Sequence, residues 1–375
     1  MSLLQQAQSA PAGQPADPIP QAPAADSVGQ QNRFAIMLVG NFLSGSGLSR
    51  SVSEELAPQL AARGWTVLTT SPQPGRLARL LDTTLTLWRK RREFALAHVE
   101  VYSGMAFGLA EAACGVLQAT GKPYILTLHG GALPTFAQRW PWRVRRLLRS
   151  ARAVTTPSRY LLEAMSPYRA DLQLLPNALK IDRYPFRPRR QPRPLLVWLR
   201  AFSSIYNPSL APRVIAALAA EFPEIHLTMV GADKGDGSLR ECQRVAQELG
   251  VVDRMEWPGA VPKEDVPQWL NRGDIFLNTT NIDNTPVSVL EAMACGLCVV
   301  STDVGGMKYL VEHERDALLA PPADATALAS AVRRLLVEPA LAERLSCQAR
   351  MTCERHDWNA VLPQWDKLLC RSADR

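Results

Sequence analysis

Short runs of apolar residues alternate along this chain with longer stretches in which hydrophobic positions recur every three or four residues. The short runs are typical of strands buried on both faces, and the longer stretches are typical of amphipathic helices. Their alternation predicts parallel sheets that are covered by helices on both faces. Strands are predicted at 34–39, 65–70, 97–102, 124–128, 153–156, 195–199, 225–230, 255–257, 275–278 and 298–301, and the clearest helices at 51–63, 209–220, 239–249, 287–294 and 325–337.

The pattern is interrupted at residues 187–194, which contain three prolines and no apolar periodicity. This segment predicts a linker between two α/β halves of similar size. The chain therefore divides into a tail at 1–33, a first domain at 34–190, a second domain at 191–355 and a last helix at 356–375. The tail is rich in Ala, Pro and Gln and lacks the basic start and apolar block of a secretory signal, so we expect it to be disordered.

Composition excludes several classes of protein. The chain has 375 residues, of which 47% are hydrophobic and 21% are charged, as in an ordinary soluble globular protein of about two domains. Seven cysteines are too few for a disulfide scaffold and suit a reducing compartment such as the cytoplasm. Cys295 and Cys298 form a C-x-x-C without a second pair at zinc spacing, so we interpret both as buried structural thiols. No apolar run approaches the length of a transmembrane helix.

The net charge of +7 is distributed unevenly along the chain. Residues 34–190 contain 22 Lys and Arg against 9 Asp and Glu, a balance of +13, whereas residues 191–375 contain 19 against 24, a balance of −5. A basic half of this size attracts an anionic partner, which could be nucleic acid, anionic lipid or a phosphorylated substrate.

The densest basic stretch of the first half lies at 140–152. Its apolar residues are spaced as on one face of a helix and its arginines lie mostly elsewhere, so it predicts an amphipathic helix. Such a helix, with tryptophans beside it, can rest on the surface of an anionic bilayer. The alternative is a solvated helix face that packs on a sheet. The basic and tryptophan side chains concerned are Trp140, Trp142, Arg143, Arg145, Arg146 and Arg149.

The stretch 281–306 carries the most informative chemistry. We expect Thr285 to be the N-cap of the predicted helix and Pro286 to be its first residue, so that the helix start offers free backbone N–H groups and a positive dipole end. Such a start is an anion site suited to a pyrophosphate. Asp283 precedes it, and Glu291 lies about one and a half turns inside the helix. Carboxylates beside an anion site suit a ligand with hydroxyls next to a phosphate, such as a sugar nucleotide.

These residues resemble a known family. The run from Asp283 to Glu291 is similar to the E-x7-E signature of the family 4 retaining glycosyltransferases, with Asp in place of the first Glu. Further motifs in the style of this family follow one another in order along the chain. They are Gly45-Ser46-Gly47, Leu128-His129-Gly130-Gly131, Pro157-Ser158, Leu175-Pro176-Asn177-Ala178, Arg200, Gly305-Gly306 and His356-Asp357-Trp358. The resemblance covers nearly the whole chain after residue 33. It implies the GT-B fold, in which two Rossmann-like parallel-sheet domains face each other across a cleft and a C-terminal crossover helix returns to the first domain.

The resemblance also implies roles for single residues. His129, Asp283 and Glu291 would be the catalytic set. Glu291 would hold the ribose hydroxyls through charged hydrogen bonds. Asp283 would orient the donor sugar or its diphosphate, and His129 would contact the donor sugar or the acceptor.

The remaining predicted contacts concern the phosphates and the acceptor. The donor and its phosphates would be bound by Arg200, Lys234, Asn284, Thr285, Val287 and Glu291. Lys234 is included because the family usually has a Lys shortly after the Arg200 position, whereas residues 201–207 contain none. Gly45, Ser46 and Gly47 would form the acceptor-side loop, since a glycine loop that opens a helix lets a phosphate or sugar approach closely.

The function implied by the resemblance is transfer of a sugar from a nucleoside-diphosphate sugar to a hydroxyl acceptor, with retained anomeric configuration. In the front-face attack of the family the leaving phosphate accepts the proton of the acceptor, so no protein nucleophile is assigned. The chain contains no Asp-x-Asp, so we expect no metal, and no cofactor is expected because the nucleotide sugar is a substrate.

Two alternatives to this transferase remain open. One is another enzyme on the same fold, either a nucleotide-sugar 2-epimerase or a glycan phosphorylase, although no cofactor lysine for a phosphorylase can be placed. The other is a non-catalytic relative whose basic half binds lipid or nucleic acid, as the absence of Lys from 201–207 would allow. For the transferase we expect an anionic or lipid-linked acceptor such as a glycan or cell-envelope precursor. We also expect peripheral contact with the inner face of an anionic membrane, and no nucleic acid.

Overall fold

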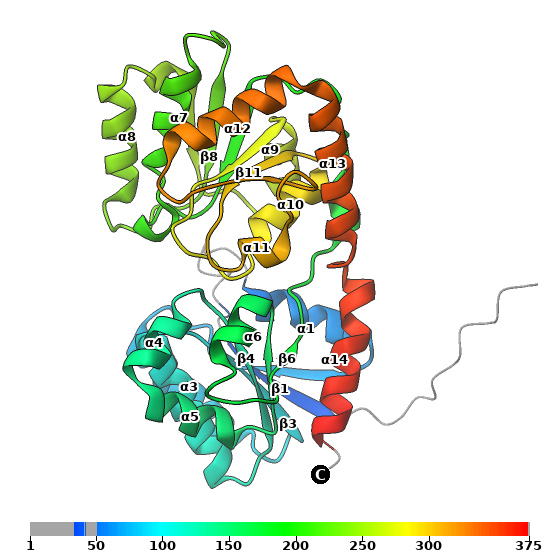
Figure 1. The fold of residues 1–375 in the computed structure, drawn as a ribbon. Helices are drawn as coiled ribbons and strands as arrows, with labels where there is room; N and C mark the ends of the chain where they lie inside the picture. Colours follow the sequence, from blue (N-terminus) through cyan, green and yellow to red (C-terminus); the bar gives the residue numbers. More distant parts are fainter. Residues whose placement is uncertain (1–33, 41, 43–50, 374–375) are drawn as a thin grey trace, which may run out of the picture. The chain divides into compact units, whose positions relative to one another are not determined.

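The computed structural model describes residues 34–40, 42 and 51–373, which form two six-stranded sheets with helices on both faces (Figure 1). Neighbouring strands are parallel throughout both sheets. The predicted α/β architecture is therefore confirmed. We refer to each sheet with the helices that cover it as the first and the second domain.

The first sheet has the strand order β2-β1-β3-β4-β5-β6. Its strands are β1 (Ala35–Val39), β2 (Thr66–Thr69), β3 (Leu96–Val101), β4 (Tyr124–Leu128), β5 (Ala153–Thr156) and β6 (Gln173–Leu174). Its helices are α1 (Val52–Ala62), α2 (Arg76–Arg89), α3 (Met105–Ala119), α4 (Leu133–Arg139), α5 (Pro141–Ser150) and α6 (Arg159–Met165).

The second sheet has the strand order β12-β11-β10-β7-β8-β9. Its strands are β7 (Leu195–Leu199), β8 (His226–Val230), β9 (Met255–Gly259), β10 (Ile275–Asn278), β11 (Cys298–Thr302) and β12 (Leu318–Ala320). The helices that follow β7 are α7 (Leu210–Leu218), α8 (Ser238–Glu248), α9 (Val266–Asn271), α10 (Val287–Cys295), α11 (Met307–Leu310), α12 (Ala325–Val337), α13 (Pro339–Glu354) and α14 (Trp358–Ala373).

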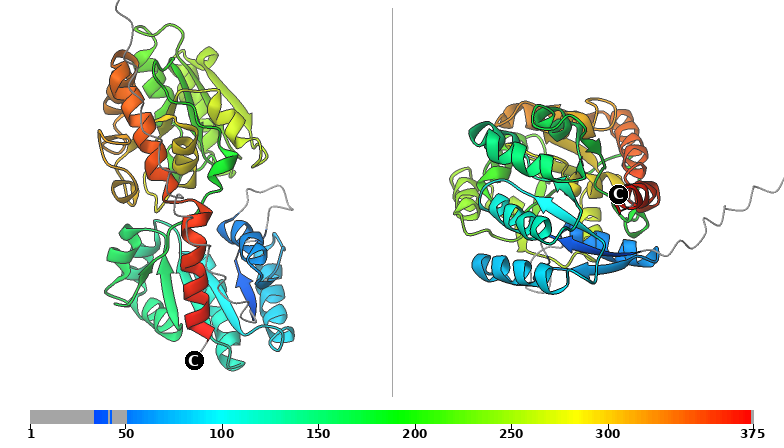
Figure 2. Two further views of the ribbon diagram at one scale, coloured as in Figure 1. Left: turned by 90° about the vertical axis from the view of Figure 1, so that its right-hand side faces the viewer. Right: turned by 90° about the horizontal axis from the view of Figure 1, so that it is seen from below.

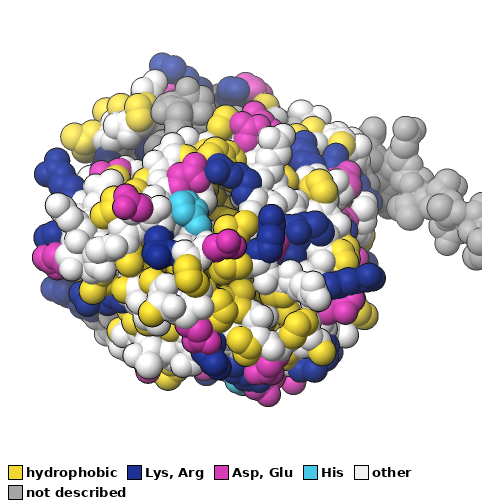
Figure 3. Space-filling model, turned by 90° about the horizontal axis from the view of Figure 1, so that it is seen from above, with side chains coloured by type: hydrophobic (Ala, Val, Ile, Leu, Met, Phe, Trp, Pro, Cys, Tyr) yellow, Lys and Arg dark blue, Asp and Glu magenta, His cyan; other side chains and the backbone are white. Residues whose placement is uncertain are grey.

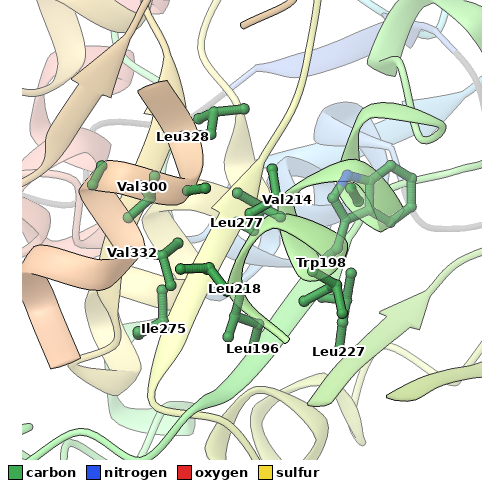
Figure 4. Close-up of a cluster of buried hydrophobic side chains, with 14 of the residues drawn as sticks. Leu196, Trp198, Val214, Leu218, Leu227, Ile275, Leu277, Val300, Leu328 and Val332 are labelled. Atoms are coloured by element: carbon green, nitrogen blue, oxygen red, sulfur yellow. The ribbon is translucent and has the colours of Figure 1, made fainter. Parts of the chain in front are cut away.

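Side chains from alternate positions of one strand enter different cores, which explains the continuous apolar runs in the sequence. On β7, Leu196 and Trp198 belong to the cluster shown in Figure 4, where they meet side chains of α7 and α12. Val197 belongs to the cluster on the opposite face, together with residues of α9, α10 and α13. The second sheet is thus buried on both faces, as its sequence predicts.

The last helix returns to the first domain, as the resemblance implies. The side view in Figure 2 shows α14, drawn in red, lying over the strands of the first sheet. Trp365 and five other apolar residues of α14 join Ile36 and Leu38 of β1 in one buried cluster. The Trp365 ring also meets the His98 ring edge-on, with their centroids 5.1 Å apart. A segment from the end of the chain therefore completes the core of the domain formed at its beginning.

The segment predicted to be a linker is packed onto the second domain. The guanidinium groups of Arg187, Arg189 and Arg193 lie 2.6, 3.1 and 3.0 Å from the carboxylate of Asp274, which is 1% exposed. Leu179, Ile181 and Tyr184 already belong to a core cluster of the second sheet. The chain thus joins the second core before residue 187. The proline-rich segment that follows is anchored to a buried carboxylate by ion pairs, which composition cannot reveal.

None of the helices within residues 51–373 combines the length and the apolar content that a membrane span requires. The predicted tail at 1–33 and the loop Gly45-Ser46-Gly47 lie outside the described residues.

The docking of α14 generates a prediction about stability. Trp365 is 5% exposed, so Trp365→Ala should lower the free energy of unfolding by about 3–5 kcal/mol through lost burial and a residual cavity. The neighbouring Lys367 is exposed, so Lys367→Ala should change it by less than about 0.5 kcal/mol. Urea unfolding of the two variants checks both values, and equal small effects would show that α14 contributes little to the first core.

Candidate functional site

The strand order of each sheet reverses once, and the reversals bring the predicted site residues to the edges where ligands bind. Successive strands step away from β1 to β2 and then restart with β3 on the other side of β1. In the second sheet the same reversal lies between β7 and β10. Ligands of open α/β sheets bind outside the carboxyl ends of the strands at such switch points. Arg200 follows β7, and Asp283 lies on the loop after β10.

Arg200 and Asp283 form an ion pair at the switch point of the second sheet, between Nη2 and Oδ2. Their side chains are only 12% and 13% exposed, and the guanidinium also lies over the Tyr206 ring, 4.6 Å from its centroid. Nε of Arg200 is buried and finds no hydrogen-bond partner among the described residues. A guanidinium with an unused donor, held by one carboxylate, is therefore placed where a ligand phosphate could replace that carboxylate.

The loop that carries Asp283 is held by Gly305 and Gly306, whose backbone lies directly against it. The Gly306 N–H donates to the Asp283 carbonyl over 2.9 Å. A Cβ on Gly306 would lie 1.5 Å from the Asn284 carbonyl oxygen, and one on Gly305 would lie 2.1 Å from the Asp283 carbonyl oxygen. Any side chain here would push the loop away from its position before α10.

The predicted N-cap of α10 is wrong by one residue. The N-cap is Pro286, whose extended backbone (φ −70°, ψ 110°) starts the helix at Val287, and no side chain caps it. The Thr285 hydroxyl instead donates to the Pro157 carbonyl of the first domain over 3.3 Å, which is why it does not cap α10. The first N–H groups of the helix remain uncapped, and the buried Ser288 hydroxyl has no partner among the described residues. The helix start thus keeps the donors of an anion site.

The same loop contacts the first domain through the motifs singled out in the sequence. The Ser158 hydroxyl donates to Oδ1 of Asn284, and Nδ2 of Asn177 donates to the Thr285 carbonyl over 3.4 Å. At Gly131, a Cβ would lie 3.0 Å from Cγ1 of Ile282. Asn284 and Thr285, predicted as donor-binding residues, therefore use their polar groups to join the two domains.

Glu291 is 3% exposed and binds different partners from Asp283. Its Oε1 accepts a hydrogen bond from the Tyr184 hydroxyl over 2.5 Å and lies 2.7 Å from Nζ of Lys263. The same Nζ lies 3.7 Å from Oε1 of Glu55 on α1. Burial opposes the charged ammonium, but Glu291 and Glu55 outweigh it and raise the pKa of Lys263. This ammonium therefore links α1 of the first domain to α10 of the second.

His129 lies at the carboxyl end of β4, on the rim of the first sheet. Its ring stacks on Tyr102 at 5.1 Å, and its Nε2 lies 3.8 Å from Oε1 of Glu100. Burial lowers the pKa of His129, although Glu100 acts in the opposite direction, so the imidazole is neutral at pH 7. Glu100 accepts hydrogen bonds from the Ser53 N–H (3.2 Å) and the Tyr102 hydroxyl (3.3 Å). His129 is therefore stacked on Tyr102, and its buried Nε2 lies near Glu100 without a hydrogen-bond partner among the described residues. The sequence analysis identified neither neighbour.

The remaining residues predicted to bind the donor or the acceptor are Lys234, Val287 and the loop at 45–47. Lys234 is exposed, and although its N–H donates to the Phe202 carbonyl, no described contact joins its ammonium to Arg200. Val287 is half-buried at the start of α10. Gly45, Ser46 and Gly47 lie outside the described residues.

Sequence reasoning missed Glu100, Tyr184 and Lys263. Glu100 carried a signal, since it is an acid on a fully buried strand and stands next to the carboxyl end of β3. Lys263 follows β9, so the rule that ligands gather beyond strand ends could have marked it as well. Tyr184 lies in no regular strand or α-helix and had no such signal. Nowhere in residues 34–40, 42 and 51–373 do three or more His, Cys, Asp or Glu side chains gather as in a metal site.

Two family models match this chain. Residues 46–183 match the model described as Glycosyltransferase Family 4, and residues 193–338 match the model described as Glycosyl transferases group 1. The two matches lie on the first and the second domain respectively.

Curated relatives match parts of the chain. The D-inositol 3-phosphate glycosyltransferase of Thermobispora bispora is 24% identical over 187 residues, which are 48% of this chain and 44% of the relative. The GDP-mannose-dependent alpha-(1-6)-phosphatidylinositol monomannoside mannosyltransferase of Mycolicibacterium smegmatis is 26% identical over 228 residues, 55% of this chain and 59% of the relative. The match thus spans about half the length of these relatives.

Solved structures share the fold over most of the chain. The sucrose-phosphate synthase of Thermosynechococcus elongatus superposes with a TM-score of 0.77 at 20% identity, covering 90% of this chain and 99% of the other. HepE of Anabaena, solved with UDP and glucose, gives a TM-score of 0.73 at 17% identity, covering 90% and 100%. At this level of identity the likeness shows the fold, which is GT-B as the sequence predicts.

The contact between Lys263 and Glu291 generates a prediction. Lys263→Met should lower the free energy of unfolding by about 1–3 kcal/mol, because the buried carboxylate loses one of its two donors. Adding Glu291→Gln should lower the free energy of unfolding less in the Lys263→Met variant than in the wild type, since the two side chains act as a pair. Urea unfolding of the wild type, both single variants and the double variant measures the coupling. Lys234→Met is the matched control and should be neutral, and strictly additive effects would contradict the pairing.

Proposed function

This chain belongs to the family 4 glycosyltransferases, and we propose that it moves a sugar from a nucleoside-diphosphate sugar to a hydroxyl acceptor with retained configuration. The observation that carries the proposal is the pairing of Arg200 with an uncapped start of α10 at the switch point of the second sheet. A departing diphosphate needs positive partners, and these two features are positive groups aimed at one place. HepE of Anabaena has been solved in complex with UDP and glucose and with UDP-glucose, which supports a nucleotide-sugar donor.

In this proposal the diphosphate takes the place of Asp283 on Arg200. The guanidinium already has an unused Nε donor, and the Ser288 hydroxyl and the first N–H groups of α10 add neutral donors. Asp283, released from the ion pair, becomes free to accept a hydrogen bond from a hydroxyl of the donor sugar. Lys234, whose N–H donates to the Phe202 carbonyl, would add a second positive charge from the neighbouring loop.

Glu291 would bind the ribose. Both donors found for it among the described residues reach Oε1, so Oε2 remains for ribose hydroxyls. Lys263 and Tyr184 then hold the carboxylate in place in its buried position. Because Lys263 also approaches Glu55, the nucleotide site is coupled to α1 of the first domain.

The chemical step needs no protein nucleophile. The bond from the anomeric carbon to the diphosphate oxygen breaks, the acceptor oxygen bonds to that carbon on the same face, and the acceptor proton passes to the departing phosphate. Arg200 and the α10 start stabilise the negative charge that develops on the leaving group. The neutral imidazole of His129, held by Glu100 and Tyr102, would accept or donate one hydrogen bond at the sugar or the acceptor.

The acceptor is proposed to be anionic or lipid-linked and to be reached from the inner face of a membrane. The balance of +13 in residues 34–190 favours an anionic acceptor on the side of the first domain. Two relatives, a D-inositol 3-phosphate glycosyltransferase and a phosphatidylinositol monomannoside mannosyltransferase, are named for compounds of this chemistry. A glycan or cell-envelope precursor of the same charge fits equally, and nucleic acid is not part of the proposal.

A panel of UDP- and GDP-sugars in a thermal-shift assay tests donor binding. A ligand at about 100 times its dissociation constant stabilises a protein by about 2.7 kcal/mol, which is readily detected. The stabilising donor is then incubated with candidate acceptors, and NMR of the product gives the anomeric configuration. Inversion would refute retention, and a donor converted without any acceptor would show an epimerase. Absence of stabilisation by every donor would favour a non-catalytic relative.

Glu291→Gln should raise the KM for the donor by about 10- to 100-fold, because a charge-assisted hydrogen bond contributes roughly 1.5–3 kcal/mol. Glu248→Gln on the exposed face of α8 is the control and should leave KM unchanged. Steady-state kinetics at saturating acceptor measure both values. An unchanged KM in a correctly folded Glu291 variant would remove this residue from the donor site.

Transfer should proceed without a divalent cation, because the positive charge for the leaving group comes from Arg200 and the start of α10. We expect the rate of transfer to remain within about twofold in excess EDTA. Arg200 and the start of α10 still stabilise the negative charge that develops on the leaving phosphate. Loss of transfer in EDTA that only Mg²⁺ or Mn²⁺ restores would contradict metal independence.

A further inference from the structure

Helix α2 exposes a row of large apolar side chains. Leu77, Leu81, Leu85 and Trp88 are 77%, 62%, 48% and 51% exposed. Their spacing of four, four and three residues places them on one face of the helix. The side chains that α2 buries, Thr83 and Leu87 among them, lie on the other face. The apolar row therefore points away from the side on which α2 packs, and the described residues leave it exposed.

The row is bordered by positive charge at both ends. Between residues 76 and 92 the chain has six Lys and Arg and one acid, Asp82. The Arg91 guanidinium lies over the Trp88 ring, 4.8 Å from its centroid. An apolar face with a cationic border and a tryptophan at its edge matches the chemistry of a membrane–water interface.

Neighbouring helices extend this surface. Side chains of α2, α3 and α5 enter one core cluster on the same face of the first sheet, so their outer sides form one layer. Met105 at the start of α3 is 76% exposed and lies 3.3 Å from a guanidinium nitrogen of Arg76. Trp142 on α5 is 67% exposed. We call the outer side of these three helices the α2–α5 face.

The arginines of α5 differ in whether another side chain of the protein binds them. Arg143 is bound by Glu111 of α3 through two contacts of 2.5 and 3.1 Å, so it serves the fold. Arg145, Arg146 and Arg149 are exposed. Only these three can contribute charge to an external partner.

We propose that the α2–α5 face docks on an anionic lipid bilayer, with the apolar row of α2 entering the boundary between headgroups and acyl chains. The inference deepens the membrane contact proposed above by naming the surface, and it does not depend on which sugar is transferred. Stable anchoring needs two signals, and this face supplies an apolar row and a basic border together. A second copy of the chain is disfavoured as the occupant, because symmetric pairing would bring two basic α2 segments together.

The position of the face agrees with delivery of a lipid-linked acceptor. Met105 is three residues after Tyr102, whose ring stacks on His129. The contact between Arg76 and Met105 places the start of α2 beside the start of α3, on the side of the sheet where β3 ends. The proposed membrane surface is thus continuous with the rim of the acceptor side of the site.

Among the residues that the structure describes, the other exposed large apolar side chains do not form such a row. On the face of the molecule seen in Figure 3, yellow side chains are mixed with acidic and basic ones, without a large field of one charge. Leu249 and Val337 of the second domain are 40% and 46% exposed, close to the value for Leu85. They provide matched controls for loss of exposed apolar area.

Co-sedimentation with vesicles of phosphatidylcholine containing about 30% phosphatidylglycerol tests the proposal. We expect the wild type to bind at low salt. Leu77→Gln combined with Leu81→Gln should weaken binding at least tenfold, while Leu249→Gln combined with Val337→Gln should leave it unchanged. Replacing Arg145, Arg146 and Arg149 with Gln should weaken binding and reduce its salt dependence. Thermal unfolding confirms that each variant is folded.

Three outcomes would overturn the proposal. They are a wild type that does not bind these vesicles at low salt, an α2 variant that binds as the wild type does, and equal losses in the α2 and control variants. Sedimentation without lipid adds a fourth, because a wild-type dimer that the α2 substitutions dissociate would assign the face to a second copy. Donor stabilisation in the thermal-shift assay is measured on the same samples. A folded α2 variant that loses vesicle binding but is still stabilised by the donor shows that failure of docking and failure of the proposed transferase are separate results.

Discussion

The ion pair between Arg200 and Asp283 joins the loops after β7 and β10, the two strands that flank the switch point of the second sheet. Both side chains are mostly buried, so neither charge is well solvated, and each depends on the other. The pair fixes the loop that begins α10, and Gly305 and Gly306 fix the same loop from the other side. The position of the helix start, and with it the anion site, follows from these constraints.

That loop also determines how the two domains meet. Ser158 and Asn177 of the first domain bind Asn284 and the Thr285 carbonyl, and Lys263 joins the carboxylates of Glu55 and Glu291. Polar contacts of this kind cost less to rearrange than an apolar interface, because water and ligand groups can replace each partner. Three of the residues proposed to bind the donor, Asn284, Thr285 and Glu291, therefore also take part in the contacts between the domains.

The sequence predicts most of the fold because parallel sheets leave a strong local record. The strands at 124–128, 153–156, 195–199 and 275–278 have the predicted bounds, since each is a continuous apolar run between turns. By contrast, β6 and β12 have two and three residues, too few to show a pattern. The predicted linker packs on Asp274, and the Thr285 hydroxyl turns to Pro157, because partners distant in sequence outweigh local preference. Glu100 and Lys263 stand at or beyond strand ends, but their partners Ser53 and Glu291 are distant in sequence, so the sequence does not show what they bind.

The central claim is that Arg200 is the phosphate-binding residue and that Asp283 occupies it in the absence of donor. Isothermal titration of UDP and GDP into the wild type and Asp283→Asn tests it most directly. The substitution removes the competing carboxylate without changing the size of the side chain. The account predicts that the better of the two nucleotides binds the variant about tenfold more tightly, the value of one freed charge-assisted hydrogen bond. Binding that is equal or weaker in the folded variant would contradict the account, since Asp283 would then not be competing with the phosphate for Arg200.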